Sequence, residues 1–219
     1  MTGNRRIGLF GGTFDPIHFG HLNIALQLKD LAQLDKVLFC PTAISPFKME
    51  QSPIASDIHR LKMCELALEG IEGCSVLDLE IKRQGVSYTI DTVKELGSGV
   101  YLMLAEDALP RLHLWKDAEA LLRLAPPIIG SRHPNTQGYN PKLFSPDIQQ
   151  LIENGRYQTR VMEISSTAIR QQLLAGGYYL GHMVPRKVLD YIHKHRLYSK
   201  EQYEERPTID TKPSCANLI

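Results

Sequence analysis

The residues "GLFGGTFDPIHFGH", at positions 8–21, run from an apolar strand through two glycines and an Asp-Pro turn to a helix start that carries two histidines. Because Gly11 and Gly12 have no Cβ atom, the backbone just after the strand is able to approach a ligand closely. A dinucleotide-binding loop would need glycines in the pattern GxGxxG, whereas after Gly8 they stand at positions 11, 12 and 20. This spacing excludes a hydride-transfer enzyme of that kind.

The rest of the chain alternates between short apolar runs and longer segments with helical spacing. Such alternation predicts an α/β fold, a Rossmann-like doubly wound parallel sheet with helices on both faces, whose ligands bind at the carboxyl ends of the strands. The motif at positions 8–21 follows the first strand and so lies at such an end. The runs that predict strands are 5–11, 36–41, 75–81, 100–105 and 126–131, and the helical segments include 21–34, 56–70 and 185–198.

The chain of 219 residues, 43% of them hydrophobic, is long enough for one good-sized domain with a normal core. We expect residues 1–198 to form it, including a small C-terminal helical segment over 166–198 in which His193 and His195 are partners of a helix dipole. Residues 199–219 have little to bury and are expected to form a mobile tail, while 131–146 are rich in Pro, Gly and Asn and are typical of a surface loop.

Charge and cysteine usage limit the partners and the compartment. With a formal net charge of +1 the chain has no global field to attract nucleic acid or an anionic membrane, so we expect neither partner. The four cysteines lack CxxC spacing, which is typical of the reducing cytosol. The N-terminus has no long apolar run of a signal peptide, and we expect a cytoplasmic protein.

His18 and His21 stand at positions i and i+3, so on a helix they would share a face. Metal ligation and simple core packing are the alternatives, but no HExxH, CxxC or nearby carboxylate cluster accompanies the pair. The helix that begins here has no acidic residue in its first turn. Free N–H groups at a helix start, together with imidazole donors, favour a site for phosphate.

The stretch "EISSTAIRQQLL", at 163–174, offers a second such helix start. Ser165, Ser166 and Thr167 supply hydroxyl and N–H groups, and neither serine is followed three residues later by the Glu or Gln of a capping box. Arg170 would fall near the first turn, where a cation opposes the helix dipole, and an external anion would resolve that conflict. Ordinary capping with a solvated Arg170 is the alternative.

Together the two helix starts resemble the HxGH and ISSTxIR signatures of the nucleotidyltransferase superfamily, and the sequence most resembles the bacterial nicotinate-nucleotide adenylyltransferase family. The resemblance covers about residues 5–198. The segments between the signatures follow that family's order and spacing: "SPFK" (45–48), "HRLKMCELAL" (59–68), "VSYTIDTVKEL" (86–96), "AEDAL" (105–109) and "LHLW" (112–115).

The resemblance assigns site residues to both substrates. The residues implied at the triphosphate of ATP are His18, His21, Lys48 and Arg170. Those that would line the ATP cleft are Gly11, Gly12, Thr13 and Phe14. Ser165, Ser166 and Thr167 would hold the phosphates from the other side, and Asp107 would lie near the adenosine. For the acceptor, the resemblance implies that Trp115 stacks on a pyridine ring. Backbone N–H groups near Thr89 and Lys116 would receive the nicotinate carboxylate, and Tyr88 and Arg132 would complete the pocket. His59, followed by Arg60, begins a helix in that family too, and we expect His59 to be structural.

The sequence departs from the family at a few positions. The usual PPHK reads Ser45, Pro46, Phe47 and Lys48, so an apolar ring replaces an imidazole beside the lysine. Ala105 replaces the glycine of the G-x-D motif, Ala118 replaces a second tryptophan, and the usual LPxW reads "LHLW".

The implied reaction joins nicotinate mononucleotide to the α-phosphorus of ATP, releasing pyrophosphate and forming deamido-NAD in NAD biosynthesis. Mg²⁺ would accompany ATP, held mainly by its phosphates rather than by protein ligands. Two alternatives stay open at this stage: an adenylyltransferase for nicotinamide mononucleotide or phosphopantetheine, and a catalytically silent nucleotide sensor. The sequence also leaves open a homo-oligomer.

Overall fold

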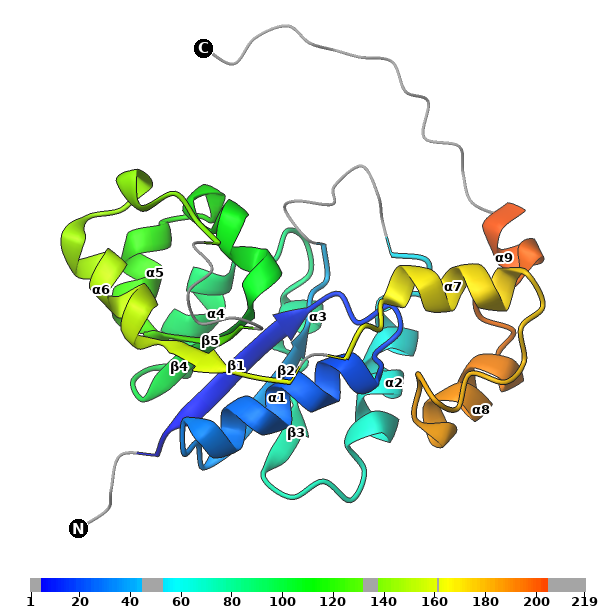
Figure 1. Ribbon diagram of the computed structural model, residues 1–219. Helices are drawn as coiled ribbons and strands as arrows, with labels where there is room; N and C mark the ends of the chain where they lie inside the picture. The colour runs from blue at the N-terminus through cyan, green and yellow to red at the C-terminus, as the bar shows by residue number, and fades with distance from the viewer. Residues whose placement is uncertain (1–4, 45–52, 132–137, 161, 205–219) are drawn as a thin grey trace, which may run out of the picture.

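The computed structural model describes residues 5–44, 53–131, 138–160 and 162–204. Six strands form one all-parallel sheet in the order β3-β2-β1-β4-β5-β6, which is the strand order of a doubly wound Rossmann-type sheet. The predicted α/β fold is therefore confirmed (Figure 1). The strands are β1 (Ile7–Gly12), β2 (Lys36–Pro41), β3 (Cys74–Val76), β4 (Val100–Ala105), β5 (Pro127–Ser131) and β6 (Arg156–Gln158).

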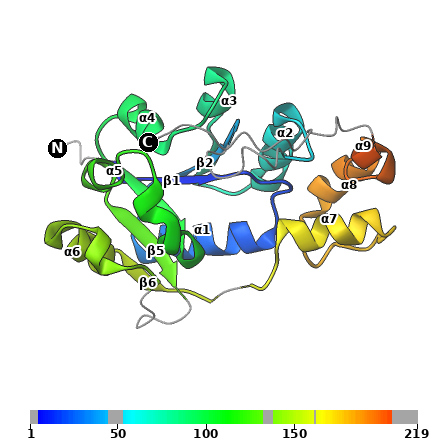
Figure 2. The ribbon, with the colours of Figure 1, turned by 90° about the horizontal axis from the view of Figure 1, so that it is seen from above.

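Helices cover both faces of the sheet, with α1 on one side of β1 and α4 on the other (Figure 2). Within the described ranges none of the helices is long and apolar enough to span a bilayer. The helices are α1 (Phe19–Leu31), α2 (Asp57–Leu68), α3 (Leu79–Arg83), α4 (Thr89–Leu96), η2 (Glu106–Leu114), α5 (Ala118–Leu124), η3 (Pro141–Leu143), α6 (Pro146–Asn154), α7 (Ser166–Leu174), α8 (Arg186–Lys194) and α9 (Lys200–Glu204).

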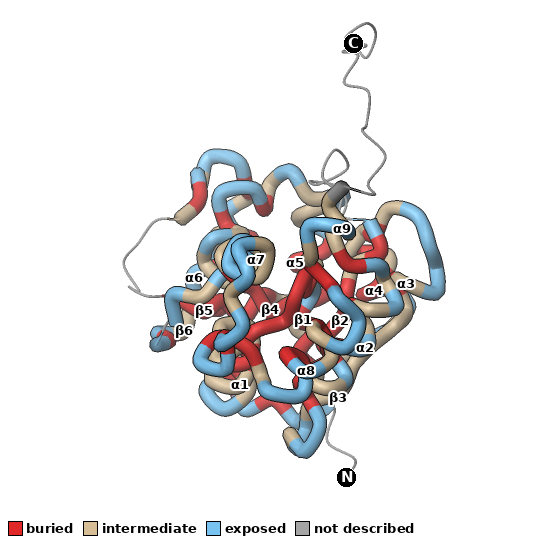
Figure 3. The backbone as a smooth tube through the Cα atoms, turned by 90° about the vertical axis from the view of Figure 1, so that its right-hand side faces the viewer, coloured by how far each residue is buried: buried red, intermediate tan, exposed pale blue. Residues whose placement is uncertain are grey.

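Each central strand sends alternate side chains into two separate cores. Phe10 of β1 belongs to the core beneath α1 and α2, while its neighbour Leu9 belongs to the core beneath α4, α5 and α6. Successive strand residues point to opposite faces, so a continuous apolar run such as that of β2 supplies both cores at once. The central strands β1, β2, β4 and β5 are accordingly mostly buried, and the outer helical surfaces are exposed (Figure 3).

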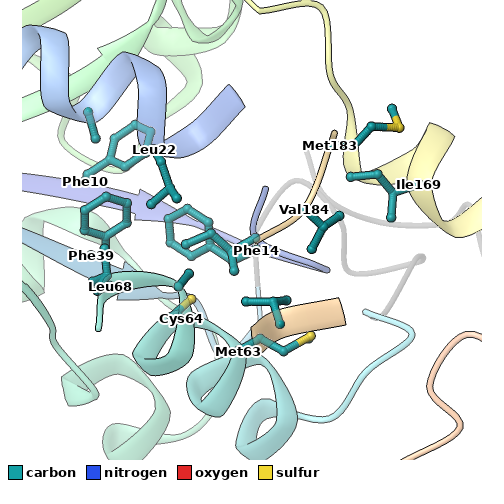
Figure 4. Packing of buried hydrophobic residues seen from close by; sticks show 14 of the residues in the cluster. Phe10, Phe14, Leu22, Phe39, Met63, Cys64, Leu68, Ile169, Met183 and Val184 are labelled. Carbon is teal, nitrogen blue, oxygen red and sulfur yellow. The ribbon is translucent and has the colours of Figure 1, made fainter. Parts of the chain in front are cut away.

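The core beneath α1 also holds the turn that follows β1. Phe14 is 2% exposed, and its ring centroid lies 5.9 Å from that of Phe10 and 6.0 Å from that of Phe39. Figure 4 shows Phe14 between these rings and Met63 of α2. Phe14 has a φ of 48°, so its backbone is in the left-handed region, where a buried aromatic side chain is costly unless packing stabilises it. The turn is thus anchored to the core rather than lying loosely over the sheet.

The prediction of a strand over 75–81 is half wrong. Strand β3 ends at Val76, and Leu79–Arg83 form α3. The alternating apolar residues suggested a strand with Glu80 on its exposed face. Instead, the side chain of Glu80 is buried and accepts a hydrogen bond from Thr92 Oγ1 at 2.8 Å. The short unit formed by α6 and the edge strand β6, which pairs with β5, was not predicted.

The last helices gather beside the start of α1, at the right of Figure 1. The backbone N–H of Phe19 donates to the carbonyl of Met183, which joins the turn between α7 and α8 to the first residue of α1. The segment 185–198 is helical only over Arg186–Lys194, with His193 in the last turn and His195 at the C-cap, as predicted. Helix α9 lies within the segment predicted to be a tail, and residues 205–219 are outside the described ranges.

Candidate active site

His18 and His21 cap each other's backbone at the start of α1. His18 is the N-cap residue, and its Nδ1 accepts the backbone N–H of His21 at 3.3 Å. In return, Nδ1 of His21 accepts the backbone N–H of His18, also at 3.3 Å. Because Nδ1 of each ring is an acceptor, the proton of each neutral imidazole stands on Nε2. The pair therefore offers two Nε2–H donors at a helix start whose first turn has no acidic residue.

The environment of His18 keeps its imidazole neutral. Only 4% of the residue is exposed, and burial lowers its pKa to about 4. Gly20 makes room for this ring, because a Cβ atom at position 20 would lie 2.9 Å from His18 Nδ1. The glycine between the histidines therefore has a packing reason, and His18 is a neutral hydrogen-bond donor rather than a fixed cation at neutral pH.

The start of α7 meets the same turn. Ser165 caps α7 by accepting the N–H of Ala168 at 3.1 Å, while Ser166 Oγ donates to the carbonyl of Pro16 at 2.9 Å. The last contact joins residues that are 150 positions apart in the chain. The two motifs that the sequence singled out therefore lie together at one edge of the sheet.

Arg170 extends from α7 to the turn after β1. Its Nη1 donates to the backbone carbonyl of Asp15 at 2.7 Å, and its Nη2 donates to Thr167 Oγ1 at 3.2 Å. The side chain is 21% exposed. Arg170 is therefore not freely solvated, because the protein itself accepts two of its hydrogen bonds. These bonds orient the guanidinium before any anion binds.

Arg60 is a component of the site region to which the sequence analysis gave no role. The residue is fully buried in α2, and its guanidinium donates to the carbonyls of Thr13 and Thr42, each at 2.6 Å. It also pairs with Asp57. Arg60 thus ties the backbone after β1 to the backbone after β2. The only sequence signal for Arg60 was its position directly after His59 in a predicted helix.

The four residues predicted to line the ATP cleft follow β1, but they differ in exposure. Gly11 is exposed with open space around it, and Gly12 and Thr13 are partly buried. Phe14 is buried, and its ring lies edge-on to the ring of His21 with centroids 5.0 Å apart. Its side chain therefore supports His21 from the core.

The predicted acceptor residues come from two neighbouring elements. Tyr88 is the N-cap of α4 and Thr89 its first residue, and Lys116 Nζ lies 4.5 Å from the centre of the Tyr88 ring. Lys116 also forms an ion pair with Asp91 at 3.2 Å. Trp115, directly after η2, is partly buried against the core that lies beneath α4.

The remaining predicted site residues are Asp107, Lys48 and Arg132. Asp107 is exposed at the start of η2, directly after β4, and so belongs to the carboxyl edge of the sheet. Lys48 and Arg132 lie outside the described residues, as does Phe47, one of the departures from the family pattern. Of the other departures, Ala105 is the last residue of β4 and Ala118 the first of α5.

Comparison with known proteins gives matches over most of the chain. The cytidylyltransferase-like family matches residues 9–172. A probable nicotinate-nucleotide adenylyltransferase from Dehalococcoides mccartyi is 36% identical over 207 residues, which cover 90% of this chain and 98% of the relative. One from a Thermoanaerobacter species is 35% identical over 210 residues, covering 92% and 98%.

The fold is also similar to solved structures. The nicotinic acid mononucleotide adenylyltransferase of Plasmodium falciparum, complexed with NaAD, superposes with a TM-score of 0.66 at 19% identity over 89% of this chain and 97% of that one. The same enzyme complexed with APC gives a TM-score of 0.64. At this level of identity the structural likeness shows the fold alone. Membership of the family is shown by the sequence relatives.

Proposed function

This chain belongs to the nicotinate-nucleotide adenylyltransferases of the cytidylyltransferase-like family, and from that premise we propose how its own residues perform the reaction. The reaction transfers the adenylyl group of ATP to nicotinate mononucleotide, giving deamido-NAD and pyrophosphate, a step of NAD biosynthesis. Catalysis is assigned to His18, His21, Lys48 and Arg170.

The observation that carries the assignment is the meeting of the two helix starts. The hydrogen bonds from Ser166 to Pro16 and from Arg170 to Asp15 bring α7 against the turn that leads into α1. Neither helix has an acidic residue in its first turn. Two positive helix ends, two imidazole donors and a guanidinium in one region match the charge of a triphosphate.

The chemistry asks for positioning rather than for a base. A phosphate monoester has a second pKa of about 6, so the attacking oxygen of the acceptor is mostly anionic at neutral pH. The main obstacle is the repulsion between two anions, which donors held in place by the protein reduce. The Nε2–H groups of His18 and His21 and the guanidinium of Arg170 suit that task, and they would stabilise charge on the leaving pyrophosphate.

The ATP cleft would be completed by residues from three places. We assign its floor to the backbone of Gly11, Gly12, Thr13 and Phe14, one wall to Ser165, Ser166 and Thr167, and a contact near the adenosine to Asp107. The exposed backbone at Gly11 supports this assignment, since nothing in the described structure occupies the space that its Cβ would fill.

Mg²⁺ would enter with ATP and neutralise part of the charge of its phosphates. Among the described residues there is no group of three or more His, Cys, Asp or Glu side chains arranged to hold a metal ion. Most of the donors at the two helix starts are N–H groups, which suit phosphate oxygens and not a cation. We therefore propose that the ion is bound through the triphosphate.

For the acceptor we propose a pocket between the start of α4 and the end of η2. Trp115 would stack on the pyridine ring, while N–H groups near Thr89 and Lys116 receive the carboxylate, with Tyr88 and Arg132 beside them. The contact of Lys116 with the Tyr88 ring supports the proximity of these two segments. We further propose a cytoplasmic location and residues 1–198 as the catalytic unit; a homo-oligomer stays a prediction.

The experiment is pyrophosphate release from Mg-ATP by the purified protein with nicotinate mononucleotide, nicotinamide mononucleotide and phosphopantetheine in parallel. We expect a strong preference for nicotinate mononucleotide. Preference for another acceptor would contradict the proposed pocket while leaving adenylyl transfer intact. Binding of ATP without release from any of the three would contradict the function and favour a nucleotide sensor.

A further inference from the structure

The carboxylate of Asp15 lies at a buried junction of three chain segments. Only 5% of the residue is exposed. Its Oδ2 accepts the backbone N–H of Ile54 at 2.8 Å, and its Oδ1 accepts the N–H of Ala55 at 3.0 Å and the hydroxyl of Tyr198 at 2.9 Å. A buried carboxylate is costly unless it is hydrogen-bonded, so this set of donors fixes the position of Asp15.

Tyr198 brings the C-terminal part of the chain to this junction. Its side chain is fully buried, and its backbone has a φ of 62°. Burial and the neighbouring Asp15 carboxylate raise the pKa of the Tyr198 hydroxyl well above its usual value. The hydroxyl therefore keeps its proton and is a permanent donor to the carboxylate.

Asp15 in turn orients Arg170 through two of its atoms. The backbone carbonyl of Asp15 accepts Nη1 of Arg170 at 2.7 Å, and the same nitrogen lies 3.8 Å from Asp15 Oδ2. A change in the position of the Asp15 side chain would therefore alter the electrostatic surroundings of the Arg170 guanidinium. The series Tyr198, Asp15 and Arg170 links the C-terminal segment to a group assigned to the triphosphate.

Gln202 of α9 holds Tyr198 in this arrangement. Its Oε1 accepts the backbone N–H of Tyr198 at 2.6 Å, and its Nε2 donates to the carbonyl of Ile54 at 3.2 Å. Gln202 thus links Tyr198 to Ile54, whose own backbone N–H donates to Asp15. The C-terminal segment is therefore joined to the site by a ring of hydrogen bonds through Tyr198, Gln202, Ile54 and Asp15 rather than by a single bond.

Resting on the proposed function, we propose that Tyr198 is a positioning residue for adenylyl transfer, which acts through Asp15 to hold Arg170 in the orientation that meets the triphosphate. The alternative is a hydroxyl that stabilises the fold and leaves the reaction unaffected. The two roles differ in what they predict for kcat, for the affinity for Mg-ATP and for the coupling of Tyr198 to Arg170.

The test is Tyr198→Phe, with Tyr191→Phe as the matched control. Tyr191 also lies near the C-terminus and also loses one hydroxyl contact, 2.9 Å to His59 Nδ1, but that contact is not with Asp15. For Tyr198→Phe we expect kcat to fall about tenfold, with the KM for nicotinate mononucleotide changed less than about twofold. The control should keep both parameters. Equal kcat for Tyr198→Phe and the unmodified protein would overturn the proposal.

A double-mutant comparison separates positioning from a general loss of stability. If Tyr198 acts through Arg170, adding Tyr198→Phe to Arg170→Ala should change kcat by less than about twofold. Multiplication of the two effects would contradict the proposed route. If Tyr198→Phe fails to fold, Gln202→Ala takes its place, and we expect a fall in kcat of about threefold in the folded protein.

Mg-ATP affinity, measured by calorimetry without an acceptor, keeps this test separate from that of the function. We expect Tyr198→Phe to weaken Mg-ATP binding at least about threefold and Tyr191→Phe to leave it unchanged. If the unmodified protein releases no pyrophosphate with any acceptor, the proposed function fails, and the affinity comparison still decides the role of Tyr198. Equal affinity of Tyr198→Phe and the unmodified protein would then overturn it.

Discussion

The ring of His18 stacks on the ring of His21, with centroids 3.7 Å apart and planes inclined by 21°, while each Nδ1 accepts the other residue's backbone N–H. This reciprocal arrangement is a capping box built from two imidazoles instead of the usual hydroxyl and carboxylate. It provides acceptors for two backbone N–H groups at the helix start without placing a negative charge there. In the proposed function, the Nε2–H groups of both rings donate to the triphosphate.

We predict that His21→Ala lowers kcat by about 10²–10³-fold, because it removes one donor from the proposed triphosphate site. Folding should suffer much less, since His21 is only partly buried. Steady-state pyrophosphate release and a thermal melt measure the two effects. The exposed His195 serves as the control, and His195→Ala should keep its activity. An inactive His21→Ala protein that is also unfolded would not support the catalytic role.

Stability should depend on pH through His18. Its pKa is about 4 in the folded protein against 6.5 when unperturbed, so the unfolded chain binds the extra proton between these values. The contribution of His18 is fully present above pH 6.5 and is lost as the pH falls towards 4, with about 2 kcal/mol lost at pH 5.

Urea unfolding at pH 7.5 and pH 5 tests this dependence. His18→Asn keeps a good N-cap residue but cannot titrate, so its free energy of unfolding should fall less than that of the unmodified protein over the same interval. Identical losses for the two proteins would show that His18 does not titrate as its burial requires.

Arg60→Met should destabilise the protein by at least about 2 kcal/mol, because the partly buried carbonyls of Thr13 and Thr42 would lose the charged guanidinium that donates to both. The matched control is Arg186→Met. The side chain of Arg186 is 84% exposed and pairs with Asp190 at 2.8 Å, and such a surface pair is worth less than about 1 kcal/mol. Denaturant unfolding measures both variants, and similar losses for the two would refute the structural role of Arg60.

Trp115→Ala should raise the KM for nicotinate mononucleotide about tenfold and leave the KM for ATP nearly unchanged, since stacking on the pyridine ring would be lost. Leu114→Ala, at the exposed neighbouring position, is the control. Initial rates with each substrate varied in turn give the comparison. An equal rise in both KM values would indicate a general disturbance of η2 instead of a lost contact with the acceptor.

Local sequence patterns determined much of this protein. The alternation of apolar runs and helical segments was sufficient for the parallel α/β sheet, because each face of a parallel sheet must be covered by a helix that returns the chain to the same edge. The motifs around His18 and Ser165 were visible because helix starts have a short-range composition, with capping side chains and no acid in the first turn. The prediction of a strand over 75–81 was wrong beyond Val76. A pattern of alternating apolar and polar residues does not show that one of the polar side chains, here Glu80, is buried.

Only the tertiary structure decided how the motifs come together. No pattern within 20 residues of Asp15 shows that its carboxylate accepts the hydroxyl of Tyr198, 183 positions away, or that its carbonyl accepts Arg170, 155 positions away. Nor does the sequence around Arg60 show that its charge is buried against the carbonyls of two other segments. Hydrogen bonds and burial depend on which atoms are close in space, and for distant segments that proximity is fixed by packing on the sheet. The sequence therefore determined the sheet and the chemistry of its two helix starts, while packing decided which residues hold them in place.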